Sequence, residues 1–389
     1  MAHHRSLKVD VHHHIFLPEL AKRKADQNAA VGWKTPPDNM PWSIQKSLEA
    51  MNKLGVAYAV LSYPAGIPEN LIESPFHSSS CGASDLLPDE EEMLWEKNRK
   101  VVRELNTHAK GLCDAAEAQG RFGWFACLPD LRNVEGALRE IAYALDVLRA
   151  DGVSLSSSYG QGSGTLYIGA DRFEPVWAEL ARRGAVVFVH GTQTPSAAPH
   201  PHACLGLPVT AVPGETFKAA AHLVVAGTKA RHAGARVVLA HCGGSAPCLA
   251  PRVAALAAHM GSGRTPEACL ADFATFFVET ALCGHGPVLQ LAESMFGRSR
   301  MLFGTDFPAV SMETIEWFTN QLEAHYADDA AALEEVTSRT ALELFPRFQV
   351  KTNKANDAAV SSYNEPNSKE VHTQNQNGAV VVSGGQHDG

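Results

Sequence analysis

Two kinds of hydrophobic pattern alternate along most of the chain. Short apolar runs rich in β-branched and aromatic residues are typical of buried strands, and longer segments with apolar residues three or four apart are typical of helices. The segment 43–55 is one such helix, because Ser43 is suited to cap its first turn and Gly55 to end it. The eight strand candidates are 7–13, 56–62, 122–128, 152–157, 185–190, 236–241, 275–280 and 300–306.

This alternation predicts the fold class. Apolar strands separated by amphipathic helices indicate a parallel sheet that is covered by helices. Eight such units within residues 1–350 predict an α/β protein with a (β/α)8 TIM barrel. A doubly wound open sheet is the alternative. That fold usually carries a glycine-rich phosphate-binding turn after its first strand, whereas this first strand runs into HHHIFLP.

The composition changes at about residue 351. The segment 351–389 is rich in Asn, Ser, Gly and Gln and poor in large apolar residues. It cannot bury enough surface to offset the entropy of ordering, so we predict a disordered polar tail after a barrel domain at 1–350. Two long connections, 63–90 and 191–214, leave the C-terminal face of the predicted barrel and are typical of lids or binding loops.

Charge and cysteine usage narrow the class of protein. The chain is 45% hydrophobic and 19% charged, and its formal net charge of −9 comes without a long Lys/Arg run, which argues against nucleic acid and anionic membranes as partners. It has no apolar run of about 18 residues or more, as a membrane span requires. The start MAHHRSLK lacks the apolar stretch of a secretory signal. Eight scattered cysteines without a CxxC pair then predict free thiols and a cytosolic protein.

Histidines follow one another in the first predicted strand. Residues two apart in an extended strand point to the same face, so we expect Asp10, His12 and His14 on one face and His13 on the other. Two imidazoles on one face can converge on a metal ion. This pair alone is weak evidence, because neighbouring histidines are commonly solvated or hydrogen-bonded in a core.

Three other predicted strands also end in residue types that bind metals. His190, His241 and Asp306 are the last residues of 185–190, 236–241 and 300–306. Polar residues at the carboxyl ends of barrel strands are typical of catalytic sites, and three histidines with one carboxylate are typical of a catalytic metal site. The sequence therefore predicts a metal site at the C-terminal face of the barrel.

The HxH pair, the single His190, HCGG at 241–244 and GTDFP at 304–308 resemble the amidohydrolase superfamily, and within it the branch typified by aminocarboxymuconate semialdehyde decarboxylase. The stretches GWKTPPDNMPWSIQKSLEAMNKLGVAYAVLS, DRFEPVWAELARRGAVVFVH and FVETALCGHGPVL further resemble the fungal 6-methylsalicylate decarboxylases. The resemblance covers about residues 8–345. It implies that one divalent metal is held by His12, His14, His190 and Asp306, with His241 as the catalytic histidine beside it.

Two departures from related families refine this expectation. Members with two metals carry a modified lysine or a glutamate at the end of the fourth strand, where this chain has GVSLSSSYG, so we expect one metal. The resorcylate-type decarboxylases carry Glu at the positions of His12 and Gly244. The resemblance therefore implies a zinc site, with manganese as the alternative, because ligand type alone does not decide between divalent metals.

The function that this resemblance implies is non-oxidative decarboxylation of a 2-hydroxybenzoate in polyketide secondary metabolism, with 6-methylsalicylate converted to 3-methylphenol. Either His241 or Asp306 would deliver the proton that the ring requires. Hydrolysis of a lactone or an amide, with Asp306 as the base, is the alternative enzyme function. A barrel with a structural metal is a third interpretation, although structural zinc sites are usually closed and rich in Cys. We expect a small aromatic acid as the substrate and a homodimer.

Several other residues near these motifs are candidates for lesser roles. Glu215 either favours a helix N-terminus or supports a ligating histidine. Phe307 is a candidate contact for an aromatic substrate, and Arg252 would bind either the substrate carboxylate or an acid on its own helix. The remaining candidates are expected to pack in the core, begin a helix or be solvated: Cys242, His285, His200 and His202.

Overall fold

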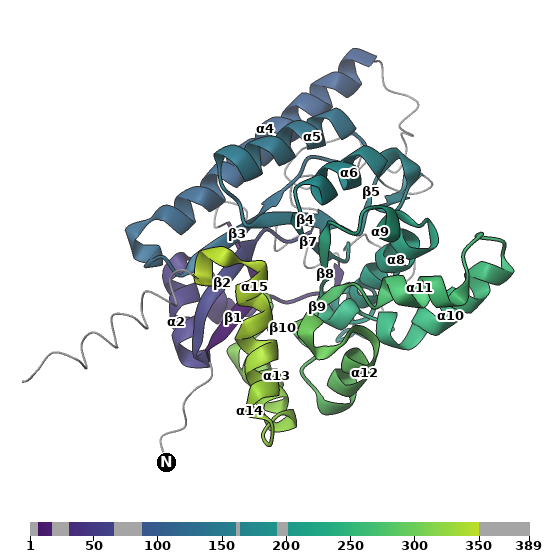
Figure 1. The fold of residues 1–389 in the computed structure, drawn as a ribbon. Coiled ribbons are helices and arrows are strands. Elements are labelled where there is room, and N and C mark those ends of the chain that lie inside the picture. The colour runs from purple at the N-terminus through teal and green to yellow at the C-terminus, as the bar shows by residue number, and fades with distance from the viewer. Residues whose placement is uncertain (1–6, 18–30, 66–87, 161–163, 193–200, 350–389) are drawn as a thin grey trace, which may run out of the picture. The chain divides into compact units, whose positions relative to one another are not determined.

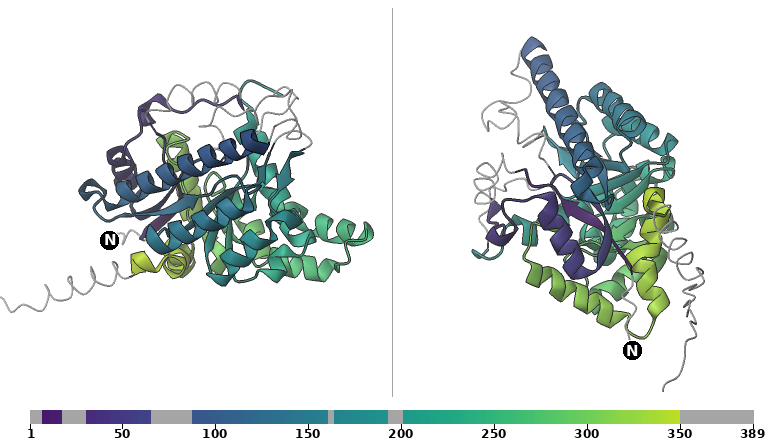
Figure 2. Two further views of the ribbon diagram at one scale, coloured as in Figure 1. Left: turned by 90° about the horizontal axis from the view of Figure 1, so that it is seen from above. Right: turned by 90° about the vertical axis from the view of Figure 1, so that its left-hand side faces the viewer.

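The structure is a computed structural model, and it describes residues 7–17, 31–65, 88–160, 164–192 and 201–349. All eight predicted strands are present, and they form one parallel sheet in chain order (Figure 1). Helices cover the outside of this sheet, as Figure 2 shows from two further directions. The strands are β1 Lys8–His14, β2 Val56–Ser62, β3 Phe122–Cys127, β4 Gly152–Ser156, β7 Val186–His190, β8 Arg236–Leu239, β9 Phe277–Glu279 and β10 Met301–Leu302.

Backbone hydrogen bonds join the first strand to the residues after the last one. Val11 N donates to Phe303 O at 3.0 Å, and Asp306 N donates to His12 O at 2.8 Å. His14 N donates to Phe307 O at 2.7 Å. These bonds bring the two edges of the sheet together, so the (β/α)8 barrel is confirmed and the open doubly wound sheet is excluded.

The helix predicted at 43–55 shows how local sequence sets element boundaries. Helix α2 runs over Ile44–Leu54, the Ser43 side chain accepts a hydrogen bond from Lys46 N, and Gly55 ends the helix with a left-handed φ of 71°. The other helices are α4 Pro88–Asp114, α5 Val134–Ala142, α6 Glu174–Arg182, α7 Leu207–Thr210, α8 Val212–Val225, α9 Thr228–Arg231, α10 Ala246–His259, α11 Pro266–Phe273, α12 Gly286–Phe296, α13 Met312–His325, α14 Ala330–Glu334 and α15 Thr340–Leu344.

The barrel interior is a packed core. Side chains from six of the strands form a buried cluster with Phe345 and Phe348, which follow α15. Within it the rings of Phe125 and Phe188 stack with their centroids 5.4 Å apart. The interior is therefore filled by side chains, which leaves the carboxyl ends of the strands as the place for a site.

Several sequence predictions differ from the structure or lie outside the described residues. A short antiparallel pair, β5 Ser158–Tyr159 and β6 Leu166–Tyr167, follows β4 and was not predicted. The tail 351–389 and parts of the connections 63–90 and 191–214 lie outside the described residues, so the disordered tail and the domain boundary at 350 stay predictions. Among the described helices, none is both long enough and apolar enough to cross a membrane.

Candidate metal centre

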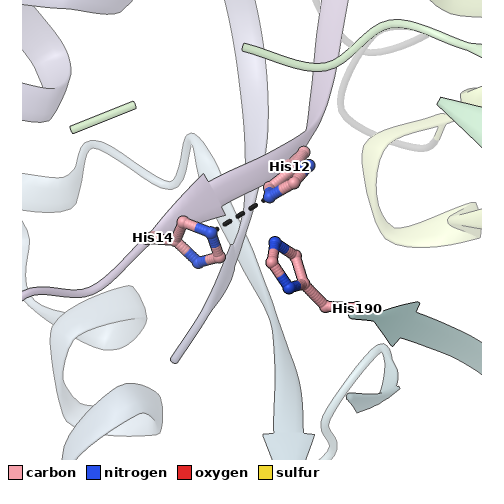
Figure 3. A group of neighbouring side chains, drawn as sticks. All are labelled: His12, His14 and His190. Carbon is pink, nitrogen blue, oxygen red and sulfur yellow. Dashed lines mark hydrogen bonds between the residues drawn. The ribbon is translucent and has the colours of Figure 1, made fainter. Parts of the chain in front are cut away.

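Five side chains from the carboxyl ends of four barrel strands converge on one point. His12 and His14 lie on β1, His190 ends β7, and His241 and Asp306 follow β8 and β10. Figure 3 shows the rings of His12, His14 and His190 turned toward one another. Nε2 of His12 lies 3.0 Å from Nε2 of His14, and Asp306 Oδ1 lies 3.4 and 3.1 Å from these two nitrogens. The structure thus brings together all five residues that the sequence predicted.

The two remaining histidines complete this group. The ring centroids of His190 and His241 lie 5.2 and 4.9 Å from that of His12. Ligand atoms of His12, His14 and His190 all lie within 4.8 Å of one another, and so do those of His12, His241 and Asp306. All five residues are at most 7% exposed. Both candidate groups share His12, so the described residues place them in one site.

Each of the four histidines has its outer ring nitrogen occupied by an acceptor. His12 Nδ1 lies 2.8 Å from Glu279 Oε1, and His14 Nδ1 lies 3.3 Å from Ser62 O. His190 Nδ1 and His241 Nδ1 lie 3.0 and 3.1 Å from the carbonyl oxygens of Gly191 and Ala281. A ring that donates from Nδ1 keeps the lone pair of its Nε2 for the cluster. This arrangement is typical of metal-binding histidines, whose outer hydrogen bond fixes the tautomer.

The donor set fits a divalent cation. With the protons on Nδ1, the Nε2 atoms of His12 and His14 and Asp306 Oδ1 are three acceptors within 3.4 Å of each other. Neighbouring lone pairs repel, and a cation between them removes that repulsion. Imidazole nitrogen and carboxylate oxygen are ligands that zinc and several other divalent metals accept.

Burial and charge set the ionisation of these groups. Burial lowers the pKa of His12 and of His190 well below the usual value, which favours the neutral, ligating form of each ring. Burial opposes the ionisation of Asp306, whereas positive charge beside its carboxylate, on His12, His14 or His241, lowers the pKa well below its usual range. With the rings neutral, a bound cation would supply that charge instead.

Glu279 is a buried carboxylate beside the cluster that the sequence analysis missed. It ends β9, is 0% exposed, and accepts hydrogen bonds from His12 Nδ1, His241 N and Ala281 N. Burial raises the pKa of Glu279 to about 7, although His241 and the backbone N–H of Ala281 oppose this shift. The signal was present in the sequence, because the predicted strand 275–280 also carries its acidic residue next to its end.

The backbone at the site adopts an uncommon conformation. His241, Cys242 and Asp306 have φ values of 55°, 52° and 63°, in the left-handed region that residues other than glycine rarely adopt. Such conformations cost about 1–3 kcal/mol each and tend to cluster at functional sites. The positions of His241 and Asp306 are thus maintained by the surrounding structure against a local backbone preference.

Asp10 and His13 form a second polar group, and Asp10 differs from its prediction. The register between β1 and β2 shifts between Asp10 and His13, so simple alternation fails there. The Asp10 carboxylate contacts His13 Nδ1 at 3.0 Å and accepts from Thr305 Oγ1 at 2.6 Å, rather than joining the cluster. His13 lies away from the cluster as expected, but it is buried and its Nε2 lies 2.8 Å from Ser47 Oγ.

A largely apolar cavity of about 360 Å³ opens onto the cluster. His14, His190, His241 and Asp306 line its polar part. Among the described residues that line the cavity, none is Lys or Arg, so these walls offer no cationic side chain to a bound anion. The apolar walls include Phe16, Trp33, Leu282, Val310 and Phe318.

Two of the lesser candidates lie away from this cavity. Phe307 is buried with its ring 5.0 Å from that of His13, because its strand-end position turns it toward the second polar group. Arg252 is exposed on α10 and is not among the lining residues. Neither residue is a described lining residue of the cavity, so the substrate contacts of Phe307 and Arg252 stay predictions.

Glu215 does not support a ligating histidine, which was one of its two predicted roles. It accepts hydrogen bonds from Tyr167 Oη and Lys218 Nζ, each at 2.6 Å, instead of supporting a histidine of the cluster. It lies in the first turn of α8, which agrees with the favourable charge at a helix N-terminus.

The remaining candidates behave as structural or exposed residues. His285 is the residue before the first turn of α12, and His202 is exposed. A hydrogen bond with Cys283 and burial raise the pKa of the Cys242 thiol well above its usual value, which disfavours the nucleophilic thiolate. His200 lies outside the described residues.

Comparisons with known proteins show the family of this chain. A family model described as amidohydrolase matches residues 85–347. The chain is 35% identical over 356 residues to 6-methylsalicylic acid decarboxylase acuB of Aspergillus aculeatus, which covers 88% of this chain and 97% of that protein. It is 33% identical over 358 residues to decarboxylase macB of Penicillium terrestre, with 89% and 97% of the two chains covered.

Solved structures support the fold. Dihydroxybenzoic acid decarboxylase from Polaromonas sp. JS666, solved with bound manganese and the inhibitor 2-nitroresorcinol, matches with a TM-score of 0.68 at 20% identity. The match covers 87% of this chain and 96% of that one. At this identity the likeness is evidence for a shared barrel.

Proposed function

Because this chain belongs to the amidohydrolase family, we propose that it is a carboxy-lyase that decarboxylates a 2-hydroxybenzoate without oxidation. The substrate that we favour is 6-methylsalicylate, and the product is 3-methylphenol. The observation that carries this proposal is the acceptor cluster at the polar end of an apolar cavity, in a chain whose relatives include a 6-methylsalicylic acid decarboxylase. A role in polyketide secondary metabolism follows from the same substrate.

His12, His14, His190 and Asp306 are the proposed ligands of one divalent metal. We favour zinc because the ligands are three imidazoles and one carboxylate, and manganese, which the Polaromonas decarboxylase holds, is the alternative. When bound, the metal would supply positive charge that attracts the substrate carboxylate and favours ionisation of the ortho hydroxyl. The region after β4 carries no Lys or Glu, which supports a single metal.

The cavity orients the substrate through its chemistry. Without Lys or Arg among its described lining residues, it would offer the anionic carboxylate one favourable place, at the cluster once a metal is bound. The aromatic ring and its methyl group then lie against the apolar walls, where Trp33 and Phe318 exclude water. A substrate with one charged end and an apolar remainder matches this division.

His241 is the proposed proton donor. Ala281 O occupies its Nδ1, so the lone pair of Nε2 takes up a proton from water, and the imidazolium then delivers that proton to the substrate. Protonation of the ring carbon that bears the carboxylate gives a cation stabilised by the ortho oxygen. The bond to the carboxylate carbon then breaks, its electron pair restores the aromatic ring, and CO2 leaves. Asp306 Oδ1 lies between His12 and His14 as a proposed ligand, which makes it the second choice as donor.

The direct test is incubation of metal-replete protein with 6-methylsalicylate, salicylate and 2,6-dihydroxybenzoate, with CO2 and the phenol as readouts. Release of CO2 with formation of 3-methylphenol supports the proposal. Turnover of lactones or amides with addition of water, and none of any ortho-hydroxy acid, would replace it by the hydrolase function. Metal analysis of the same protein should give about one ion per chain. The homodimer and the cytosolic location stay predictions.

A further inference from the structure

We propose that Glu279 is a positioning residue that holds the metal ligand His12 and the proton donor His241 in one fixed arrangement. Its carboxylate lies behind the cluster, completely buried at the end of β9. Oε1 lies 2.8 Å from His12 Nδ1 and accepts from His241 N at 2.6 Å, while Oε2 accepts from Ala281 N at 2.6 Å. One side chain thus contacts the residues that serve both proposed steps, metal binding and proton transfer.

The contacts around Glu279 form a closed loop that includes His241. Glu279 accepts from the backbone N–H of His241 and of Ala281, and Ala281 O in turn lies 3.1 Å from His241 Nδ1. The main chain and the ring of His241 are therefore fixed from the same side. Since His241 has a φ of 55°, these bonds maintain a backbone conformation that the residue would otherwise disfavour.

The neighbouring strand leaves space for this carboxylate. Gly304 follows β10, and a Cβ atom at that position would lie 2.1 Å from Glu279 Oε2 and 3.0 Å from His12 Cβ. Any other residue at 304 would displace the carboxylate or the His12 side chain. Glycine at 304 is therefore needed to leave space for the Glu279 carboxylate beside His12.

The three donors around Glu279 require a group that only accepts. A carboxylate offers two acceptor oxygens to the three N–H groups. A glutamine places its NH2 group against at least one of these N–H donors in either orientation. Glu279→Gln therefore keeps nearly the same shape, but it leaves at least one of the three N–H donors without an acceptor.

The test compares Glu279→Gln with Glu140→Gln in the full chain. Glu140 is a matched control, because it is also a buried carboxylate, bound by Arg103 Nε and Asn106 Nδ2 at 2.9 and 2.8 Å, but on α5 and without a contact to the cluster. Metal-stripped proteins are titrated with Mn²⁺ and with Zn²⁺ by calorimetry. We expect Glu279→Gln to raise the metal Kd by about 10- to 100-fold, as the loss of an outer hydrogen-bond partner does in other metal sites. Glu140→Gln should lower Tm with a metal Kd within about twofold of the parent protein.

Activity supplies the second readout, and this half of the test rests on the proposed function. At saturating metal, Glu279→Gln should still lower kcat with 6-methylsalicylate, with a smaller change in KM, because His241 loses its position. A metal Kd and a kcat equal to those of the parent protein would overturn the proposal.

Glu279→Asp covers the case in which the Gln variant does not fold. It keeps the charge but shortens the side chain, and we expect an intermediate metal Kd; parent-like affinity in the Asp variant would also overturn the proposal. If the parent protein binds metal but decarboxylates nothing, the proposed function fails while the metal titrations still decide the role of Glu279.

Discussion

Nε2 of His12 lies 3.0 Å from Nε2 of His14, while Nδ1 of each ring faces an acceptor of its own. Two residues of one strand therefore present lone pairs to the same point. If the ring protons lie on the two Nδ1 atoms, no hydrogen bond can join the two Nε2 atoms. The relationship between these two nitrogens is a clear geometric sign of a cation site within the described residues.

Removal of either imidazole should release the metal. We expect His12→Ala and His14→Ala to retain well under one metal ion per chain after dialysis, because each loses one of the four proposed ligands. Metal analysis of the purified proteins measures this. His202→Ala, at an exposed histidine, is the control and should keep the parent content. Full metal content in both cluster variants would remove the ligand assignment.

His241 should matter for turnover and not for metal content. Asparagine at 241 can still donate to Ala281 O but has no counterpart of Nε2. We expect His241→Asn to lower kcat by about 100- to 10,000-fold, the usual range for a lost general acid, with about one metal per chain retained. Steady-state kinetics and metal analysis of one preparation check both points. An unchanged kcat would indicate that Asp306, rather than His241, donates the proton.

His13 should contribute to stability more than to the metal site. His13→Ala leaves the buried Asp10 carboxylate without its ring partner and Ser47 Oγ without His13 Nε2. We expect the free energy of unfolding to fall by about 1–3 kcal/mol, which is the cost of unsatisfied buried polar groups. The metal content should stay near the parent value. Urea denaturation followed by metal analysis distinguishes the two effects. Loss of metal would mean that the Asp10 group supports the cluster more directly.

Gly304 should be as sensitive as Glu279. A methyl group at 304 would collide with Glu279 Oε2, so Gly304→Ala should weaken metal binding in the same direction as Glu279→Gln. Gly111→Ala is the matched control, since nothing lies within 4 Å of a Cβ there and the residue is exposed in α4. We expect that control to bind metal normally and to gain up to about 1 kcal/mol of stability from helix propensity. Equal metal affinities in the two alanine variants would contradict the idea that Glu279 needs the space left free at Gly304.

Acid sensitivity should depend on Glu179. Hydrogen bonds from Arg182 and Arg183, together with their charges, lower the pKa of Glu179 to about 2, although burial opposes the shift. A lowered pKa adds stability above the unfolded value of 4.5, and that stability is lost as the pH falls toward 2. We expect Glu179→Gln to cost about 1 kcal/mol at neutral pH, after allowance for solvent screening, and to flatten the loss of stability between these pH values. Denaturation at several pH values measures the slope; an unchanged slope would argue against the shift.

Much of the fold and the cluster could be predicted because both depend on strand ends. Apolar runs marked all eight strands, and a parallel barrel necessarily brings the residues after β1, β7, β8 and β10 to one face. The position of His190 beside His12 follows from that geometry without knowledge of any contact.

The remaining features depend on details that periodicity does not contain. The register shift between Asp10 and His13 breaks strict alternation, so the Asp10 carboxylate turns to Thr305. Arg252 lies on the outer face of α10 because of how that helix packs, which a distance in sequence does not reveal. Glu279 ends the short strand β9, which has only three residues. Its position could have been recognised because other strands of the barrel also end in polar residues.

The bonds that close the barrel link positions that are far apart in the chain: Thr305 N donates to Asp10 Oδ1 across 295 positions. During synthesis, His12 and His14 are made well before their carboxylate partner Asp306 is added. At about 5–20 residues per second, the interval is on the order of 15–60 s. The nascent chain thus carries an incomplete ligand set throughout this interval. Any messenger truncated before the last strand would yield a product that cannot mature into a metal-loaded protein.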